Sequence, residues 1–509
     1  MVFSLILFSI YLSIILWLIY RNGLFGVFRD NNIQPKHYTL IFLCKAMAVP
    51  VFYLVYKKLY GGIDDLDAGK FFHDVQVIHR GALKDFGFYV RLMFGLQNDL
   101  PGSSDFENCL KDTLNWDNGT AKDYLYNDNR VLIRAHTLFA FFAFQSYFVH
   151  ALFSCLLSFI GLQGIYKTFK TYFAEKEILF MLILCFVPAL WFYTGALLKE
   201  GLTVFILGNL LYRTKKMVIG PSGKTVLSLL PFVFLALLLK PYLLFFSFLA
   251  FGLFFVIELR STFIHKAAFY FSFVLVGVLA LNFLSVEIKH RSLLEAALKH
   301  RRIFAGVAKG GIFLAKDDTF IRLKNDSTQL ALVSSANKAY TIKKGVGYMY
   351  WINNNDQDTM YCAANKDTTT VYELKYVIQE SRSNINANAV HAGITAMVGH
   401  ALYYSLFYPM FVQAKGVMQL LASVENLALV LALIGLVFFL FRSKQPKFLP
   451  LVLLFVCLSV CFLVGIATPN SGAIYRYRSP VLAFVFMALL YYLPALKIKK
   501  NKKRESPYI

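Results

Sequence analysis

Long uncharged apolar runs separated by short basic connections are the dominant pattern of this chain. Residues 1–20, 178–198 and 448–475 contain no charged side chain. About 20 mostly apolar residues are enough for a helix to cross the hydrocarbon layer of a membrane. The pattern therefore predicts about eleven membrane-spanning helices, at residues 1–20, 38–56, 138–165, 178–198, 201–212, 225–239, 241–258, 267–286, 416–441, 448–467 and 479–496.

The charges of the short connections predict the direction of these spans. Basic groups follow the first, third, fifth, seventh and ninth spans, and the basic tail KIKKNKKR follows the last. Lys and Arg accumulate in cytoplasmic connections, so this alternation predicts an N-terminus outside and a C-terminus in the cytoplasm. Residues 1–20 lack a preceding basic stretch and a small-residue cleavage site, so we interpret them as a retained first helix.

Two long segments, residues 57–137 and 287–415, lie outside in this topology. The second begins with a helical pattern, VEIKHRSLLEAALKHRRIF, and continues with short runs separated by turn residues, which are typical of strands. These runs are GGIFLA, TFIRL, QLALVSS, GVGYMYWI, TMYCAA and TTVYELKYVI. We therefore expect a small β-rich domain within residues 307–380. Residues 390–415 are apolar but contain His, Gly and Pro, and we expect them to lie along the outer interface or dip into it.

The predicted fold class is an all-α polytopic membrane protein with a small β-rich extracytoplasmic insertion. Composition agrees, because 58% of the 509 residues are hydrophobic and 16% are charged, against about 45–50% and 25% in soluble domains. The net charge of +23 is typical of cytoplasmic Lys and Arg that contact anionic lipids, so membrane lipids are the expected partners and nucleic acid is not. The predicted parts are two N-terminal spans (1–56), an acidic outer loop (57–137), a six-span core with two short hairpins (138–286), the β-rich insertion with an interfacial segment (287–415), three C-terminal spans (416–496) and a basic cytoplasmic tail (497–509).

Two of the predicted hairpins are too short to be pairs of ordinary spans. Residues 178–212 are interrupted only by Lys199 and Glu200, and the second arm has twelve apolar residues before Arg213. Twelve helical residues reach about 18 Å, whereas the hydrocarbon layer is about 30 Å thick. Residues 225–258 repeat the pattern with Lys240 as their only charge before Glu258. Charges at that depth are tolerated beside protein or water, so the two tips predict a cationic cavity open to the outside; the alternative is that both lysines extend outward along their stems.

An acidic cluster follows the second span. Asp64, Asp65 and Asp67 lie in GGIDDLDAGKFFHD, and His73 and Asp74 follow within a few turns. A carboxylate just outside the membrane can act as a general base or bind a divalent metal. The alternative is that one of these aspartates caps the helix that follows. The two histidines of this region are six residues apart, which is not the spacing of a helical zinc site.

Two further motifs place charges in or near the last spans. Glu425 lies inside the ninth span, where a carboxylate is by default a candidate for function; the alternative is an ion pair with a cation of another span, such as Lys45 or Lys199. Arg476, Tyr477 and Arg478 precede Pro480, which we expect to begin the last helix. An arginine at this boundary presents a planar fork that suits phosphate.

Three segments together resemble the GT-C class of multi-spanning glycosyltransferases, which use polyprenyl-phosphate-linked sugars, and most resemble a poorly characterised bacterial branch of that class. They are GGIDDLDAGKFFHD, FVPALWFYTGALLKEG and PNSGAIYRYRSP, with the VEN of the ninth span as a weaker likeness. Their order along the chain matches. The chain departs from the usual pattern by placing the acidic motif after the second span and by having DDLD where many relatives have a simple acidic pair.

The resemblance implies roles for these residues. Asp64 or Asp65 would be the catalytic base or a metal ligand, Arg476 and Arg478 would bind the donor phosphate, and a divalent metal would be the only cofactor. The implied partners are a polyprenyl-phosphate-linked sugar and a glycan acceptor, and the implied location is the bacterial inner membrane. The lysine tips would add Lys199, with the neighbouring Glu200, and Lys240 to the phosphate site.

Two other functions fit the sequence. A polymerase or ligase of lipid-linked surface polysaccharide also has many spans and a large outer loop, and depends on arginines more than on aspartates. A transporter of a lipid-linked or anionic substrate would use the intramembrane charges Glu425 and Lys199. Inverted halves would favour transport, and the sequence shows no internal repeat.

Overall fold

The computed structural model divides the chain into two compact units. The first consists of Met1–Tyr270, Ala428–Cys457 and Ser479–Ile509, and the second of Phe271–Leu427 and Leu458–Arg478. The residues described within them are 2–64, 66–98, 102–116, 128–240, 242–258, 262–289, 292–295, 311–316, 319–323, 329–334, 339–352, 361–364, 368–378, 394–468 and 470–494.

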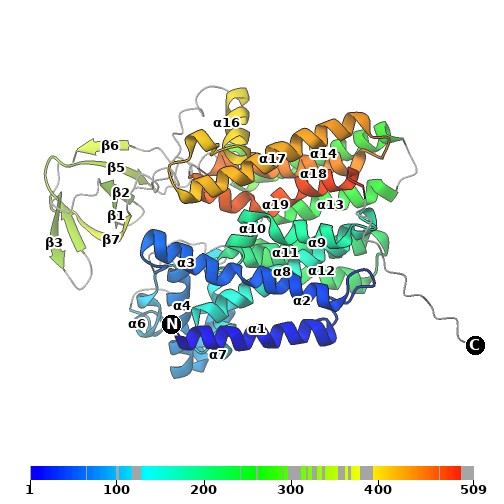
Figure 1. Cartoon of the computed structure of the whole chain (residues 1–509). Coiled ribbons are helices and arrows are strands. Elements are labelled where there is room, and N and C mark those ends of the chain that lie inside the picture. Colours follow the sequence, from blue (N-terminus) through cyan, green and yellow to red (C-terminus); the bar gives the residue numbers. More distant parts are fainter. Residues whose placement is uncertain are drawn as a thin grey trace, which may run out of the picture. The chain divides into compact units, whose positions relative to one another are not determined.

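Helices make up most of the described chain (Figure 1). The first unit contains α1 (Val2–Asn22), α2 (Pro35–Ala46), α3 (Ala48–Tyr60), α4 (Asp67–Lys84), α5 (Phe86–Met93), α6 (Ser104–Asn108), η1 (Leu110–Asp112), α7 (Asp128–Ala143), α8 (Tyr147–Phe169), η2 (Lys170–Tyr172), α9 (Glu177–Phe186), α10 (Pro188–Tyr193), α11 (Lys199–Ile219), α12 (Gly223–Leu239) and α13 (Tyr242–Glu258). Both units share α14 (Phe263–Lys289), α17 (Val417–Arg442), α18 (Phe448–Ala467) and α19 (Ser471–Tyr492). The second unit adds α16 (Ile394–Leu406), η5 (Phe411–Gln413) and seven strands.

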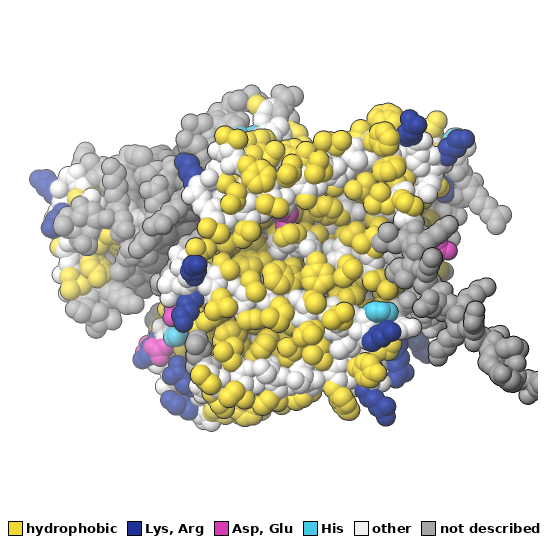
Figure 2. Space-filling view, viewed as in Figure 1, with side chains coloured by type: hydrophobic (Ala, Val, Ile, Leu, Met, Phe, Trp, Pro, Cys, Tyr) yellow, Lys and Arg dark blue, Asp and Glu magenta, His cyan; other side chains and the backbone are white. Residues whose placement is uncertain are grey.

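Several of these helices are long and apolar enough to cross a membrane, so the chain is an integral membrane protein. Within the described residues there are seven, at Val2–Asn22, Pro35–Leu59, Tyr147–Tyr172, Phe263–Glu287, Val417–Arg442, Phe448–Ala467 and Ser471–Tyr492. Shorter apolar helices lie at Glu177–Phe186, Gly223–Leu239 and Leu243–Ile257. Apolar side chains cover the face formed by α1, α2 and α3, and Lys and Arg side chains gather toward its two ends (Figure 2). Such a surface suits lipid contact, because large exposed apolar patches are rare on soluble proteins.

The third predicted span begins later than the sequence suggested. The apolar run at residue 138 belongs to α7, which ends at Ala143, and Phe144 and Gln145 then have positive φ angles of 48° and 56°. The span is therefore α8, which begins at Tyr147. The prediction of one helix over 138–165 was wrong because this turn contains no Gly or Pro.

The two predicted hairpins differ in length. The second arm of the first hairpin is α11, which continues through the basic residues RTKK to Ile219 and has 21 residues. It therefore reaches about 31 Å, enough to cross the membrane, and the prediction of a short twelve-residue arm was wrong because the helix continues past Arg213. The arms of the second hairpin, α12 and α13, have 17 residues each and reach about 25 Å, so the second hairpin is short as predicted.

The closest helix contact of the first unit joins α8 and α11. A Cβ built on Gly208 of α11 would lie 1.7 Å from the carbonyl oxygen of Gly161 of α8, and one on Gly164 would lie 2.5 Å from that of Gly208. In the first turn of α11, a Cβ on Gly201 would meet the Ser154 hydroxyl of α8 at 2.2 Å. Small residues allow backbones in membranes to approach this closely, where van der Waals packing holds helices together. This contact fixes the height of α11 against α8.

Hydrogen bonds gather several predicted cytoplasmic connections at one end of the first unit. Lys170, after α8, forms an ion pair of 2.7 Å with Asp30, which lies between α1 and α2. Lys176 donates to the carbonyl oxygens of Leu490 and Tyr491, both at 3.1 Å, at the end of α19. The first connection, the connection after α8 and the end of the last span therefore share one end, as the charge alternation predicts.

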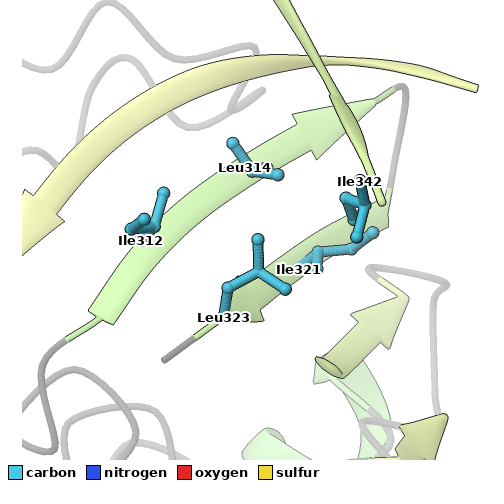
Figure 3. Packing of buried hydrophobic residues seen from close by; sticks show 5 residues of the cluster. All are labelled: Ile312, Leu314, Ile321, Leu323 and Ile342. Atoms are coloured by element: carbon cyan, nitrogen blue, oxygen red, sulfur yellow. The ribbon is translucent and has the colours of Figure 1, made fainter. Parts of the chain in front are cut away.

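The predicted β-rich domain is an antiparallel sheet with the order β3-β4-β7-β1-β2-β5-β6. Its strands are β1 (Gly311–Lys316), β2 (Thr319–Leu323), β3 (Leu330–Ser334), β4 (Ala339–Ile342), β5 (Gly347–Ile352), β6 (Tyr361–Ala364) and β7 (Val371–Ile378). All six predicted runs form strands, and β4 was missed. The register pairs Ile312 with Leu323 and Leu314 with Ile321, and these four side chains pack with Ile342 into a small core (Figure 3). Of the predicted helix before the sheet, residues 286–304, positions 290, 291 and 296–304 lie outside the described part.

Filling the α8–α11 contact should unfold the first unit. Gly208→Leu would force the two backbones apart, and overpacking of this kind costs about 3 kcal/mol or more. The expected result is a thermal transition of the purified protein lowered by several degrees, or loss of folded protein. Gly223→Ala is the matched control, because a Cβ on Gly223 meets nothing within 4 Å. Equal stability of the two variants would contradict the close contact.

Candidate functional site

The acidic segment forms a tight turn between α3 and α4. Gly61 ends α3 with a φ of 79°, Ile63 is buried and Asp64 is exposed. A Cβ on Gly69 of α4 would lie 2.2 Å from the carbonyl oxygen of Ile63 and 2.7 Å from Cα of Asp64, so the turn lies directly on α4. Gly69 therefore allows the turn to present Asp64 to solvent.

The helix-cap interpretation of these aspartates does not hold for the described residues. The N-cap of α4 is Leu66, which makes no side-chain cap bond. Asp67 is the first residue of α4 and suits the positive end of the helix dipole. Asp64 is thus exposed without a capping role, and Asp65 lies outside the described residues.

The lysines at the two hairpin tips converge on one carboxylate. Lys199 Nζ lies 2.6 Å from Asp128 Oδ1, and Lys240 Nζ lies 3.9 Å from Asp128 Oδ2. The side chains of Lys199 and Lys240 are each 12% exposed and that of Asp128 is 33% exposed. We call Lys199, Lys240 and Asp128 the lysine cluster. The two predicted tips therefore meet at one carboxylate, and the cationic cavity open to the outside stays a prediction.

Each lysine of the cluster stands at a helix end. Lys199 begins α11, after Leu198 in an extended conformation, and Glu200 is buried beside it. Lys240 is the C-cap of α12, with φ −153° and ψ 95°. Asp128 is the first residue of α7. The ends of three helices, α7, α11 and α12, therefore supply the cluster. Its geometry depends on the contacts that hold those helix ends in place.

The turn before Lys199 is fastened to the joint between α2 and α3. Trp191 Nε1 donates to the carbonyl oxygen of Cys44 at 3.1 Å, and Lys45 Nζ donates to the Thr194 hydroxyl at 2.7 Å. A Cβ on Gly195 would lie 2.4 Å from Cβ of Ala48, so the two chain segments touch there. Lys45 is fully buried. These contacts hold the break that follows α10 against the joint between α2 and α3.

The helix that carries the acidic turn runs beside the lysine cluster. Lys199 Nζ lies 5.7 Å from the centre of the Phe71 ring, and Phe71 is on α4. Phe71 follows Asp67 by four residues, about 6 Å along the helix. The structure therefore brings the first turn of α4 and the lysine cluster into one region of the first unit.

Asp74 and His73 make structural contacts. The fully buried carboxylate of Asp74 accepts hydrogen bonds from the backbone N–H groups of Leu114 at 2.6 Å and Asn115 at 2.7 Å, and His73 Nδ1 lies 3.4 Å away. Burial raises the pKa of the Asp74 carboxyl, although these hydrogen bonds act in the opposite direction. The carboxylate ties α4 to the following loop and does not face solvent.

In the second unit the predicted motifs of the last spans meet one another. Arg478 Nη2 donates to Asn426 Oδ1 and lies 3.6 Å from Glu425 Oε1, and its Nη1 donates to the carbonyl oxygen of Ser405 at 2.5 Å. Asn426 Nδ2 donates to the carbonyl oxygens of Phe407 and Pro409. Arg478, Glu425 and Asn426 are all buried. The ion-pair interpretation of Glu425 is confirmed, with Arg478 as the cation in place of the expected Lys45 or Lys199.

These bonds explain why the three polar residues lie at membrane depth. The carbonyl oxygens of Ser405, Phe407 and Pro409 belong to the end of α16 and the turn after it, where a helix leaves its last carbonyls without helical partners. An arginine and an amide satisfy them, and Glu425 neutralises the arginine. The described part of the expected interfacial segment 390–415 is therefore held by hydrogen bonds from Arg478 and Asn426. Arg478 thus has a structural role.

The last helix begins earlier than Pro480. α19 starts at Ser471, and Asn470 Oδ1 accepts the backbone N–H groups of Gly472 and Ala473. Pro480 thus lies inside the helix. The guanidinium of Arg476 stacks on the neighbouring Tyr477 ring with 5.5 Å to its centre, and Arg476 is partly exposed. Arg476 is the arginine of this motif that can reach a ligand.

Sequence reasoning missed Asp128, which joins the predicted lysines. Its signal was present, because an aspartate at the start of an apolar helix in the first outer loop is placed to meet outer cations. Among the residues that the structure describes, which do not include Asp65, no group of three or more His, Cys, Asp or Glu side chains is placed to hold a metal ion. Comparison with protein-family models, curated proteins and solved structures gave no match.

Breaking the Arg478 network should destabilise the second unit. Glu425→Gln leaves the arginine as an uncompensated buried charge, which costs about 3–5 kcal/mol. We expect Arg478→Met to be similarly unstable and the double variant to be less destabilised than the sum, as measured by thermal unfolding in detergent. Arg476→Met is the control and should unfold like the wild type. Additive single effects would argue against the pair.

Proposed function

We propose that this protein is a GT-C type glycosyltransferase that moves a sugar from a polyprenyl-phosphate donor to a glycan acceptor at the extracytoplasmic face of a membrane. The observation that carries the proposal is the meeting of Lys199 and Lys240 at one carboxylate, beside the helix that begins at the acidic turn. Two ammonium groups in a partly buried site suit a phosphate, and an exposed carboxylate nearby suits a base.

In this proposal the acidic turn and the lysine cluster have separate roles. Asp64 or Asp65 removes the proton from the acceptor hydroxyl as its oxygen forms a bond to the anomeric carbon. The bond between that carbon and the phosphate oxygen breaks, and the electron pair leaves with the phosphate. Lys199 and Lys240 stabilise the charge that develops there, which is the usual way that enzymes assist such leaving groups. In the second unit Arg478 holds α16, and the phosphate role that the resemblance implies for Arg476 stays a prediction.

We also propose eleven spans, with the N-terminus outside and the C-terminus in the cytoplasm of a bacterial inner membrane. The seven long apolar helices and the three shorter ones account for ten spans. The eleventh is α11, whose lysines and glutamate lower its mean hydropathy. With α9 and α10 counted as one span, the lysine cluster and the acidic turn fall on the outer side.

Cysteine labelling tests this topology. In a cysteine-free background, Ser104→Cys should react with a membrane-impermeant maleimide in intact spheroplasts, because α6 lies outside. Lys224→Cys, at the start of α12, should react only after the membrane is opened. Both positions are exposed, so access alone does not separate them. Labelling of Lys224→Cys in intact spheroplasts would reverse the orientation.

Sugar transfer by the purified protein tests the enzyme. We expect Asp64→Asn and Asp65→Asn, singly or together, to lower kcat by about 10²–10⁴, the usual contribution of a general base. Asp85→Asn is the control, since Asp85 is 58% exposed and lies 3.5 Å from Arg91. The probes are polyprenyl-phosphate sugars with lipid-linked glycan acceptors, followed by mass spectrometry.

Other outcomes would select another function. Full turnover in the Asp64 and Asp65 variants would contradict the proposed base. If polymer growth then stopped in Arg476→Ala, the protein would be a polymerase or ligase. Passage of substrate into sealed proteoliposomes without chemical change would identify a transporter.

A further inference from the structure

We propose that Asp128 is an internal counter-anion that a phosphoryl group of the substrate displaces from Lys199 and Lys240. The inference deepens the proposed function and rests on it only for the source of that phosphoryl group. Asp128 lies in the place that the ligand would take, since one of its oxygens is 2.6 Å from the Lys199 ammonium and the other is 3.9 Å from the Lys240 ammonium.

The geometry of the lysine cluster matches a phosphoryl group. A carboxylate that divides its two oxygens between two ammonium groups has the same bridging arrangement as two oxygens of a phosphate. The phosphate brings a third oxygen and more negative charge, so it makes stronger charge-assisted hydrogen bonds than the carboxylate. Lysine acts as a point charge toward such a group and does not need a planar partner.

Burial shows which member of the cluster moves. The lysine side chains are 12% exposed, whereas that of Asp128 is 33% exposed. Two ammonium groups taken out of water need an anion, because an uncompensated buried charge is costly. Asp128 supplies an anion to both lysines when no substrate is bound, and its more exposed side chain can rotate toward solvent.

The start of α7 gives the displaced carboxylate a favourable position. Asp128 is in the first turn of a 16-residue helix, where the helix dipole stabilises negative charge by about 0.3–1 kcal/mol. Lys199 is fixed from the other side by the Gly201–Ser154 contact and by the turn that Lys45 and Trp191 hold. These contacts fix Lys199, whereas the proposed displacement requires only rotation of the Asp128 side chain at the start of α7.

The displacement predicts a measurable rise in affinity when Asp128 is neutralised. A ligand that competes with an internal partner can bind only those molecules in which the site is open. Its apparent affinity is therefore its intrinsic affinity multiplied by the fraction of such molecules. For a partly buried ion pair such as this one, the fraction is about one in five to one in ten. Asp128→Asn should thus bind phosphate about fivefold to tenfold more tightly, and Asp128→Glu should stay near the wild type.

The test is equilibrium binding to the purified full chain in nanodiscs, with polyprenyl monophosphate and inorganic phosphate as separate probes. Lys199→Met and Lys240→Met should weaken binding of whichever probe occupies the site. Asp85→Asn and Lys111→Met are the controls, at ion-paired positions outside the cluster. An affinity of folded Asp128→Asn equal to or below that of the wild type would overturn the proposal.

A second measurement uses the wild type, in case Asp128→Asn does not fold. Saturating probe should increase modification of Asp128 by a carboxyl-selective reagent, read by peptide mass spectrometry, while Asp85 stays constant. Unchanged or lower reactivity of Asp128 would contradict displacement.

The two probes, polyprenyl monophosphate and inorganic phosphate, separate this inference from the proposed function. Tighter binding of polyprenyl monophosphate by Asp128→Asn supports displacement even if no sugar is transferred, and the glycosyltransferase proposal then fails alone. Tighter binding of inorganic phosphate only supports displacement and assigns the site to a free anion. Sugar transfer with unchanged affinity in Asp128→Asn would overturn displacement and leave the enzyme proposal intact.

Discussion

The backbone contact between α8 and α11 determines where the candidate chemistry can lie. Glycines at the crossing allow the two helices to touch, and Gly201 brings the first turn of α11 against Ser154. Because the same turn carries Lys199 and Glu200, their height in the membrane is set by α8. Larger residues at the crossing would move the lysine away from Asp128 before any catalytic group was altered.

The helix breaks of both units are matched by polar side chains. In the first unit Lys45 and Trp191 connect the break after α10 to the joint of α2 and α3. In the second unit Arg478 and Asn426 bind the carbonyl oxygens at the end of α16. Irregular backbone at membrane depth is tolerated where protein satisfies it. The charges that look catalytic in the sequence therefore divide into those that bind backbone carbonyl groups, such as Arg478, and those that pair with Asp128, namely Lys199 and Lys240.

The sequence predicts the elements of this protein better than their junctions. Apolar length found the seven long apolar helices of the described chain. Residue alternation found six of the seven strands; β4 was missed because Lys and turn residues surround its four positions. The break at Phe144 contains no glycine or proline and could not be predicted. Helix length predicted the Lys240 tip correctly, whereas the twelve-residue arm expected after Lys199 is a helix of 21 residues. The position of Asp128 depends on how α7 returns to these lysines. The pairing of Glu425 with Arg478 could not be predicted from the sequence. The two residues are far apart in the chain, since 52 positions separate Arg478 from Asn426, the neighbour of Glu425.

The joined breaks around Thr194 make one side of the lysine cluster stiff. The segment from Trp191 to Leu198 is bonded to the joint of α2 and α3 and packed on Ala48. Moving that tip would therefore require two membrane helices to move with it. In the proposed displacement, a ligand would meet a fixed Lys199 and an adjustable carboxylate, so rotation of the Asp128 side chain alone would accommodate it.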